Sequence, residues 1–149
     1  MKVHLSELRN RPVMDLSSAT TIGRIERVVI DLERSAISGF VLGKVEGPEI
    51  ILPWDGVKSI GPDAVTIDDT SLMREPSGSA ETRSAAGDLE PVGKLVLTQY
   101  GDEAGELRDL VLETETGEAT DLVIGEQTVP GRQLLGIGDY AAIVSTTDR

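Results

Sequence analysis

One hydrophobic pattern occurs twice in this chain. The stretch GRIERVVIDLERSAISGFVLG begins at Gly23, and GELRDLVLETETGEATDLVIG begins at Gly105. Apolar residues keep their places between the copies, whereas charged residues change sign, as Arg24 and Glu106 do. Packing constrains buried volume more tightly than solvent constrains surface charge. We therefore infer an internal duplication, although two β-rich stretches can also resemble each other by chance.

The two copies align without a gap from Val13 and Leu95 to the glycine that ends each quoted stretch. Beyond that glycine the second copy is shorter and the correspondence stops. The copies are separated by residues 71–91, SLMREPSGSAETRSAAGDLEP, which show neither a strand nor a helix period. This organisation predicts a domain at residues 1–70, a flexible linker at 71–91 and a second, degenerate domain at 92–149.

Each copy is typical of short β-strands joined by tight turns. Runs of Val, Ile and Leu are interrupted by turn residues, and the segments ERSA at Glu33 and ETGE at Glu115 each predict a hairpin. We expect strands at residues 13–16, 24–33, 36–43, 49–54, 64–67, 94–99, 106–114, 119–125, 133–135 and 140–145. Helix is expected only as single turns near SELRN and DGVKSI. The pattern favours an all-β fold of two small barrels in tandem.

Strand alternation leaves apolar residues on the outer face of each barrel. If Val28 points into the first barrel, its neighbours Ile25 and Val29 should point outward. We expect the barrels to bury these faces against each other with pseudo-twofold symmetry, or otherwise to form a homodimer. The candidate contacts between the barrels, or with a partner, are Ile25, Val29, Val41, Trp54, Leu107, Val111 and Val123. The alternative is a β-bulge near Arg27, which would leave Val29 inside.

The chain carries a net charge of −12, and most of it lies in the second half. Residues 75–149 contain fifteen Asp and Glu against five Lys and Arg. Because nucleic-acid affinity depends on Lys and Arg that displace counterions, we expect no nucleic-acid binding. No apolar stretch approaches the roughly 20 residues that span a bilayer, and no signal peptide is evident, so we expect a cytoplasmic protein without membrane insertion.

The residues needed for common catalytic sites are scarce. There is one histidine, His4, and no cysteine, so no Ser–His–Asp or Cys–His set can form. No phosphate-binding loop is present. Asp and Glu are plentiful, and Glu113 and Glu115 share one strand face, but no acidic loop has the spacing of a calcium site. We therefore expect no catalytic residues, no metal ligands and no cofactor.

The first copy resembles a PRC-barrel domain. That family has an opening strand ending in Asp, a glycine-containing step into a long strand, a hairpin, and a tail of the form PW.DV..IG.DAV. The matching residues here are Pro12, Val13, Asp15, Gly23, Asp31, Gly39, Pro53, Trp54, Val57, Ile60, Gly61, Ala64 and Val65. The second copy is similar through Gly125 but lacks the Pro-Trp tail and reads QLLGIGDYAAIVS instead. The resemblance implies a small barrel of about six strands that docks other proteins.

The expected function is therefore a non-catalytic protein-binding or adaptor module whose partner is another protein. One alternative is a metal- or small-ligand-binding regulatory protein that uses the acidic loops. A second alternative is a hydrolase with a pair of facing carboxylates, which would require a deep pocket.

Overall fold

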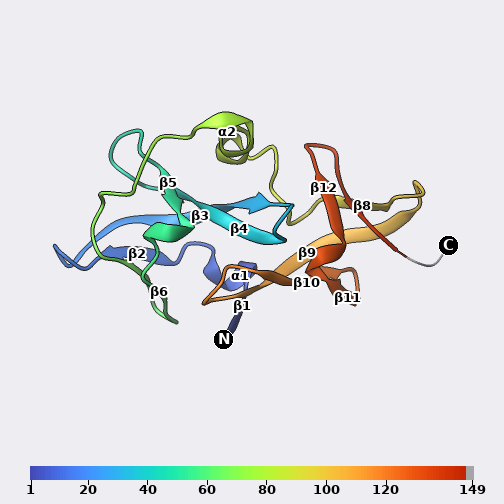
Figure 1. Ribbon diagram of the computed structural model, residues 1–149, viewed down its shortest axis with the longest axis horizontal. Helices are drawn as coiled ribbons and strands as arrows, with labels where there is room; N and C mark the ends of the chain where they lie inside the picture. The colour runs from blue at the N-terminus through green and yellow to red at the C-terminus, as the bar shows by residue number, and fades with distance from the viewer. Residues whose placement is uncertain (147–149) are drawn as a thin grey trace.

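The computed structural model describes residues 1–146, whose strands form two curled sheets side by side along the long axis of the molecule (Figure 1). In the first sheet, which we call unit 1, the strand order is β5-β4-β3-β2-β7-β6. Its strands are β2 (Pro12–Asp15), β3 (Thr20–Asp31), β4 (Ala36–Gly43), β5 (Ile51–Pro53), β6 (Ser59–Ile60) and β7 (Val65–Ile67). A 3₁₀ turn, η1 (Trp54–Gly56), connects the sheet's two end regions.

The second sheet, unit 2, repeats this arrangement strand for strand. Its order is β11-β10-β9-β8-β13-β12, and β8 pairs in parallel with β13 as β2 does with β7. The strands are β8 (Leu95–Thr98), β9 (Glu103–Glu113), β10 (Ala119–Ile124), β11 (Gln127–Pro130), β12 (Leu134–Ile137) and β13 (Ala141–Val144), with η2 (Gly131–Gln133) in the place of η1. The predicted fold of two small β-barrels in tandem is therefore confirmed.

The central hairpins of the two units share their irregularities. The pairing of β3 with β4 contains two register shifts, and the pairing of β9 with β10 contains both of them at the equivalent positions of the repeat. At one shift, the Ser38 hydroxyl donates to the Val29 carbonyl at 3.4 Å. At its counterpart, the Thr120 hydroxyl donates to the Val111 carbonyl at 3.3 Å. The repeat therefore extends to the bulges.

Outside the central hairpins, loop lengths change the alignment of the two copies. Val13 pairs with Gly23 and Val96 pairs with Gly105, so the counterpart of Val13 is Val96 and not the predicted Leu95. In the tail, equivalent residues of the two copies are separated by fewer positions along the chain than in the central hairpins. The reason is that the loop between β10 and β11 is five residues shorter than the loop between β4 and β5. The strands of the tail are thus present in unit 2, although the sequence comparison did not detect them.

The units meet at the ends of their central hairpins. The Ile37 N–H donates to the Gly117 carbonyl at 2.8 Å, and the Ala119 N–H donates to the Ser35 carbonyl at 2.8 Å. The two donors occupy equivalent positions of the repeat, and so do the two acceptors. Exchanging the units therefore exchanges the two hydrogen bonds, as expected for a twofold contact.

The pseudo-twofold axis passes through one residue pair. Between these two hydrogen bonds, Ala36 forms an isolated antiparallel bridge with Glu118, which is its own counterpart in the repeat. The predicted pseudo-twofold packing is confirmed. We call residues 35–37 and 117–119 the joint.

The segments that precede the two barrels cross over. The strand β1 (Lys2–His4) and helix α1 (Leu5–Leu8) lead into unit 1, but β1 pairs with β9 of unit 2 and α1 packs beside the same strand. The helix α2 (Gly78–Ala86) leads into unit 2, but it packs on β3 of unit 1 (Figure 1). Each unit is thus covered by the segment that leads into the other.

The helix α2 lies in the segment predicted to be a flexible linker, where no helix was expected. Its sequence, GSAETRSAA, has no strong apolar stripe, so its stability comes from contacts outside the helix. Glu81 accepts hydrogen bonds from Arg74, and Ala85 packs against unit 1. Gly87, with a φ of 88°, ends the helix in the left-handed conformation. Residues 147–149, the end of the predicted second domain, lie outside the described residues.

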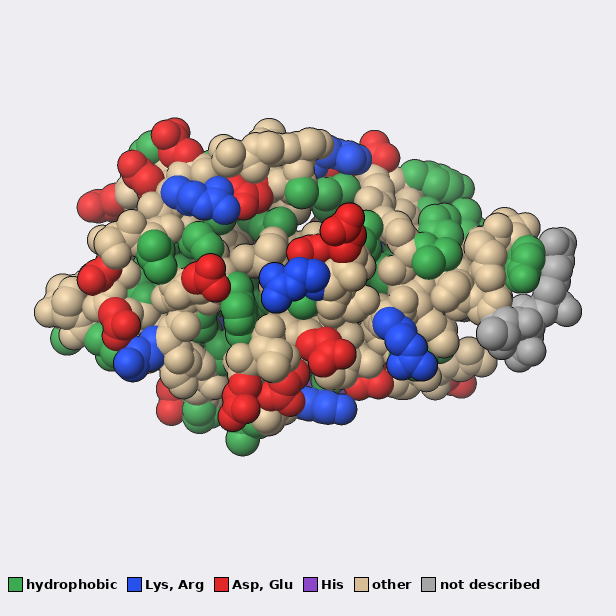
Figure 2. All heavy atoms as spheres, viewed as in Figure 1, with side chains coloured by type: hydrophobic (Ala, Val, Ile, Leu, Met, Phe, Trp, Pro, Cys, Tyr) green, Lys and Arg blue, Asp and Glu red, His purple; other side chains and the backbone are tan. Residues whose placement is uncertain are grey.

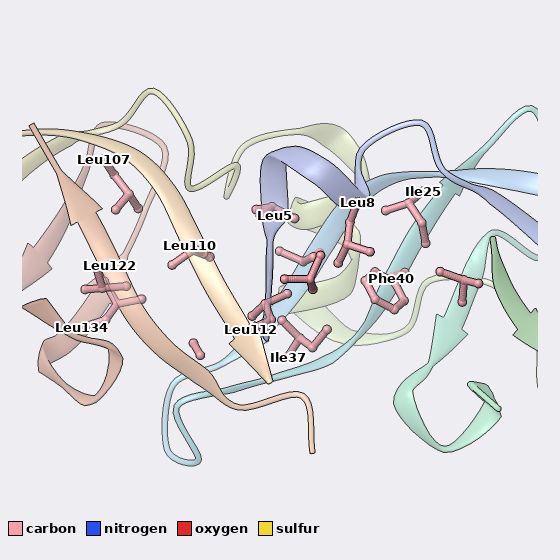
Figure 3. Packing of buried hydrophobic residues seen from close by; sticks show 14 of the residues in the cluster. Leu5, Leu8, Ile25, Ile37, Phe40, Leu107, Leu110, Leu112, Leu122 and Leu134 are labelled. Atoms are coloured by element: carbon pink, nitrogen blue, oxygen red, sulfur yellow. The ribbon is translucent and has the colours of Figure 1, made fainter. Parts of the chain in front are cut away.

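A single hydrophobic core runs through both units (Figure 3). Leu5 and Leu8 of α1 lie between the β9 side chains Leu110 and Leu112 and the unit 1 side chain Phe40. A smaller cluster lies beneath α2. Because neither barrel encloses a separate core, the stability of each depends on the other.

Candidate functional site

Two of the predicted contact residues lie inside the barrels. Ile25 and Leu107 were expected on the outer face, but they are 0% and 1% exposed and belong to the shared core. A register shift directly follows each of them, and the extra residue reverses the alternation at that point. The alternative of a bulge near Arg27 was therefore correct about the bulge, but the side chain that it turns inward is Ile25 and not Val29.

Three further predicted residues are outside the barrels but are not buried by the opposite sheet. Val29 and Val41 face outward and are covered by Ala85 of α2. Val111, the counterpart of Val29, is buried where β1 pairs with β9. In each unit, a crossed-over segment covers the apolar outer face. The sequence pattern had predicted that the other barrel would cover this face. Val123 is half-buried on β10.

Trp54 contacts both units. Its ring lies 6.4 Å from that of Phe40, measured between centroids, and it packs against the shared core. On its other side lies the joint: a Cβ placed on Gly117 would come within 3.2 Å of two indole carbons. In unit 2 the position of Trp54 is held by Gly131, where a Cβ would overlap the carbonyl oxygen of Ala119. The Pro-Trp pair therefore becomes Pro-Gly because no side chain fits.

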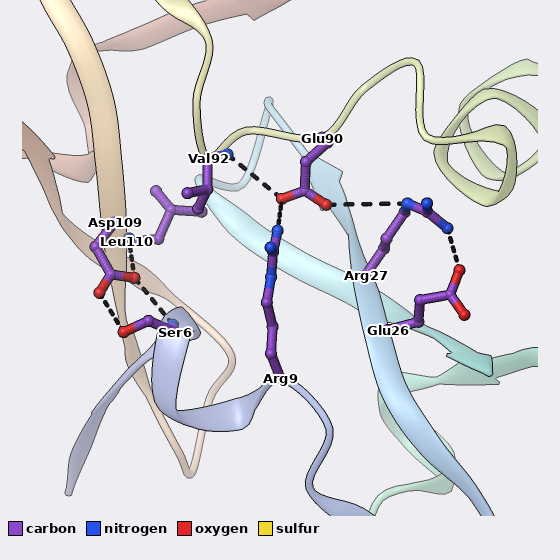
Figure 4. Close-up of polar contacts among 8 residues, drawn as sticks. All are labelled: Ser6, Arg9, Glu26, Arg27, Glu90, Val92, Asp109 and Leu110. Atoms are coloured by element: carbon purple, nitrogen blue, oxygen red, sulfur yellow. Dashed lines mark hydrogen bonds and ion pairs between the residues drawn. The ribbon is translucent and has the colours of Figure 1, made fainter. Parts of the chain in front are cut away.

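Polar contacts that sequence reasoning missed hold the crossed-over segments (Figure 4). Asp109 on β9 accepts a hydrogen bond from the Ser6 backbone N–H at 3.0 Å and from the Ser6 hydroxyl at 2.5 Å. Arg27, the counterpart of Asp109 in unit 1, donates to the Ala85 carbonyl of α2 at 3.4 Å. One position of the repeat therefore holds the crossed-over segment in both units, through side chains of opposite charge.

An ion pair connects the two lead segments at the same place. Arg9, just after α1, pairs with Glu90, just before unit 2. Glu90 also lies 4.0 Å from the Arg27 guanidinium and accepts a hydrogen bond from the Val92 N–H at 3.4 Å (Figure 4). The only sequence signal for this network is a set of opposite charges at positions distant in the chain. The arrangement stabilises the crossing, and Arg9, Arg27 and Glu90 also line a surface hollow of about 420 Å³.

Within residues 1–146, a hollow of about 810 Å³ forms a groove on unit 1. Its floor is formed by the half-buried side chains of Ile22, Val45 and Met73, which pack on the core. Its rim is polar and exposed, and consists of Thr20, Thr21, Lys44, Glu46, Glu49 and Thr70. An apolar floor with a polar rim is typical of a site that receives another molecule.

The groove exists because of the longer loop of unit 1. Residues 44–50 connect β4 to β5, and Gly23 lets this loop approach β3, since a Cβ there would lie 2.7 Å from Val45. β3 begins four residues before Arg24, the first of its residues that pairs with β4, so that no strand of residues 1–146 occupies the groove side of residues 20–23. Unit 2 has the tight turn Gly125–Glu126 in place of this loop, and the hollow at the start of β9, lined by Glu103, Gly105 and Glu106 among others, is smaller, at about 370 Å³.

Two carboxylates near the groove, those of Asp15 and Asp69, are fixed as hydrogen-bond acceptors. The Ser17 hydroxyl, together with the N–H groups of Ser17 and Ser18, holds the pKa of Asp15 below its ordinary value. Hydrogen bonds from Ser71 likewise lower the pKa of Asp69. A carboxyl that acts as a general acid at neutral pH needs a raised pKa, so neither residue is suited to that role.

Other candidate chemistry is sparse within residues 1–146. No three Asp, Glu or His side chains in this part of the chain gather closely enough to hold a metal ion. His4 is half exposed, and its Nδ1 lies 3.4 Å from Asp109. On the face shown in Figure 2, Lys and Arg side chains are spread singly among acidic ones. Of the described helices, neither has the length and apolar character required to cross a bilayer.

Comparison with known proteins identifies the family of the first half of the chain. A search of curated proteins finds no match. Residues 1–74 match the family model described as PRC-barrel domain, and this range contains all of unit 1 with its groove. Through this first unit, whose strand order unit 2 repeats, the chain belongs to the PRC-barrel family.

Proposed function

We propose that the protein is a non-catalytic protein-binding module, and that the groove of unit 1 receives a segment of its partner protein. PRC-barrel domains serve as protein-interaction folds, which supports a binding role. The observation that carries the proposal is the groove itself, where an apolar floor lies beside residues 20–23 of β3, whose edge toward the groove has no neighbouring strand among residues 1–146. Such a strand can pair with an extended segment through backbone hydrogen bonds.

The lining of the groove fits this mode of recognition. Apolar side chains of the partner segment would lie on Ile22, Val45 and Met73, which are already partly buried. The Thr21 hydroxyl donates to Met14 Sδ at 3.0 Å and the Thr20 hydroxyl is hydrogen-bonded to that of Ser18, and both oxygens can still accept a hydrogen bond from a bound backbone N–H. The rim carries Lys44 together with two glutamates, so it does not select strongly for one sign of charge. Specificity would come from the pairing register and from the floor.

Affinity capture from a lysate of the native host, with three forms of the full chain, tests the proposal. The Thr21→Trp variant fills the groove, whereas Thr21→Val keeps its shape and serves as the matched control. We expect a set of proteins that the wild type and Thr21→Val retain and that Thr21→Trp loses. Binding of one recombinant candidate is then measured by calorimetry. Equal retention by all three forms would contradict the groove as the binding site.

A further inference from the structure

The end strand of unit 1 is paired on both of its edges. β5 pairs with β4 on one side. On the other side, the Ile51 N–H donates to the Arg74 carbonyl at 2.9 Å, and the Arg74 N–H donates to the Ile51 carbonyl at 3.1 Å. Arg74 follows β7 and is held in place by Glu81 of α2. Unit 1 thus carries an antiparallel partner for its own edge strand.

In unit 2 the equivalent edge has no partner among the described residues. Val123 pairs with Thr128 as Val41 pairs with Ile51, so Thr128 occupies the position of Ile51. In an antiparallel ladder, residues whose N–H and C=O point toward the neighbouring strand alternate with residues whose groups point away. Ile51 directs both groups outward to Arg74, and Thr128 in the same register therefore directs both outward too. Thr128 is exposed, and apart from the pairing of β11 with β10, neither its N–H nor its C=O forms a backbone hydrogen bond within residues 1–146.

We propose that the outer edge of β11 binds an extended, basic segment of a partner protein, which adds to the sheet as an antiparallel strand opposite Thr128. The internal pairing of Ile51 with Arg74 is the precedent for this geometry. Pro130 has no N–H and ends the edge on one side, so the pairing is short and centred on Thr128. The edge and the groove lie on different units, and either proposal can fail without the other.

The negative charge of unit 2 favours a partner segment with positively charged side chains. Residues 92–149 contain eleven Asp and Glu but only four Lys and Arg, and the exposed Glu126 directly precedes the edge. A segment with Lys or Arg side chains is attracted to this surface. A second copy of the chain would instead bring two acidic surfaces together, which is unfavourable. A basic partner segment is therefore favoured over self-association.

A blocked, fluorescently labelled octapeptide of alternating Val and Lys tests the proposal on the full chain by fluorescence anisotropy. Thr128→Pro removes the outward N–H without breaking the bonds to β10, and an edge position tolerates proline. Thr128→Val changes the side chain but keeps the N–H, so it is the matched control. We expect Thr128→Val to bind like the wild type and Thr128→Pro to bind roughly tenfold more weakly or not at all. Peptide addition should also slow amide hydrogen exchange at Thr128.

Four outcomes would overturn the proposal. They are no binding to the wild type, equal binding by Thr128→Pro, equal binding of an octapeptide of alternating Val and Glu, and a wild-type dimer in analytical ultracentrifugation that Thr128→Pro abolishes. The last outcome would assign the edge to a second copy. Circular dichroism of Thr128→Pro checks that its fold is kept, and if it is not, exchange at Thr128 in the wild type decides alone.

Discussion

The Leu8→Ala substitution tests whether the two units fold as one. Leu8 is 0% exposed and lies on α1, which leads into unit 1 but packs on β9 of unit 2. Truncating a buried Leu costs about 2–5 kcal/mol, through lost burial and the cavity that remains. We expect about 3 kcal/mol, because hydrogen-bonded strands of both units surround the site and limit its collapse. A domain of this size has only about 5–15 kcal/mol in total.

Urea unfolding measures the effect with two probes. Trp54 is the only tryptophan and reports on unit 1 and the joint, whereas far-UV circular dichroism reports on both units. In both proteins the two probes should show one coincident transition, with a lower midpoint and an unchanged slope in Leu8→Ala. Leu16→Ala is the control, since Leu16 is 51% exposed, and should change stability by less than about 0.5 kcal/mol. Two separate transitions, one of them at the wild-type midpoint, would refute the shared core.

Two further predictions concern single positions. Gly131→Ala should lower the melting temperature strongly, because the new Cβ overlaps the Ala119 carbonyl. Gly136→Ala is the control: its new Cβ meets no atom within 4 Å, so the melting temperature should hardly change. Similar melting temperatures for the two variants would contradict this prediction. Hydrogen bonds from Arg74 hold the pKa of Glu81 below its ordinary value of 4.5. The stability that these bonds contribute is therefore complete above pH 4.5. It is lost as the pH falls through the depressed pKa of Glu81 in the folded state. Urea midpoints of the wild type and Glu81→Gln should therefore differ at about pH 6 and converge toward about pH 3, and a constant difference would be inconsistent with this account.

The sequence predicted the duplication and most strands because apolar alternation survives drift. The gapless comparison failed where loops changed length. Pro130 stands in the place of Pro53, but five residues are missing from the preceding loop, so the tail of unit 2 fell out of alignment. The strand β11 was also missed, since its sequence QTVP is short and begins with two polar residues.

The faces of the strands were harder to predict than their positions. Regular alternation placed Ile25 and Leu107 outside, and the bulges that turn them inward have no distinct sequence signature. Val29 and Val41 were correctly placed outside, but their cover could not be deduced. It is α2, a helix made of small residues whose stability depends on contacts distant in the sequence.

The candidate sites depend on differences between the repeats more than on the repeat itself. The groove requires the longer loop of unit 1, which the sequence displays, and a start of β3 that pairs with β2 but not with β4, which only the strand pairing reveals. The unpaired edge at Thr128 became apparent only by comparison with Ile51, whose outer edge pairs with Arg74. Neither position carries an unusual residue type, so composition alone gave no indication of them.

The crossed lead segments determine how this protein can be divided. A fragment that stops at residue 74, where the family match ends, lacks α2 and so exposes Val29 and Val41 to water, while its first eight residues lose the strand on which they rest. The complementary fragment loses β1 and α1 in the same way. The two barrels therefore depend on each other to fold, and deletion studies guided by the family boundary would report misfolding and not the separate roles of the halves.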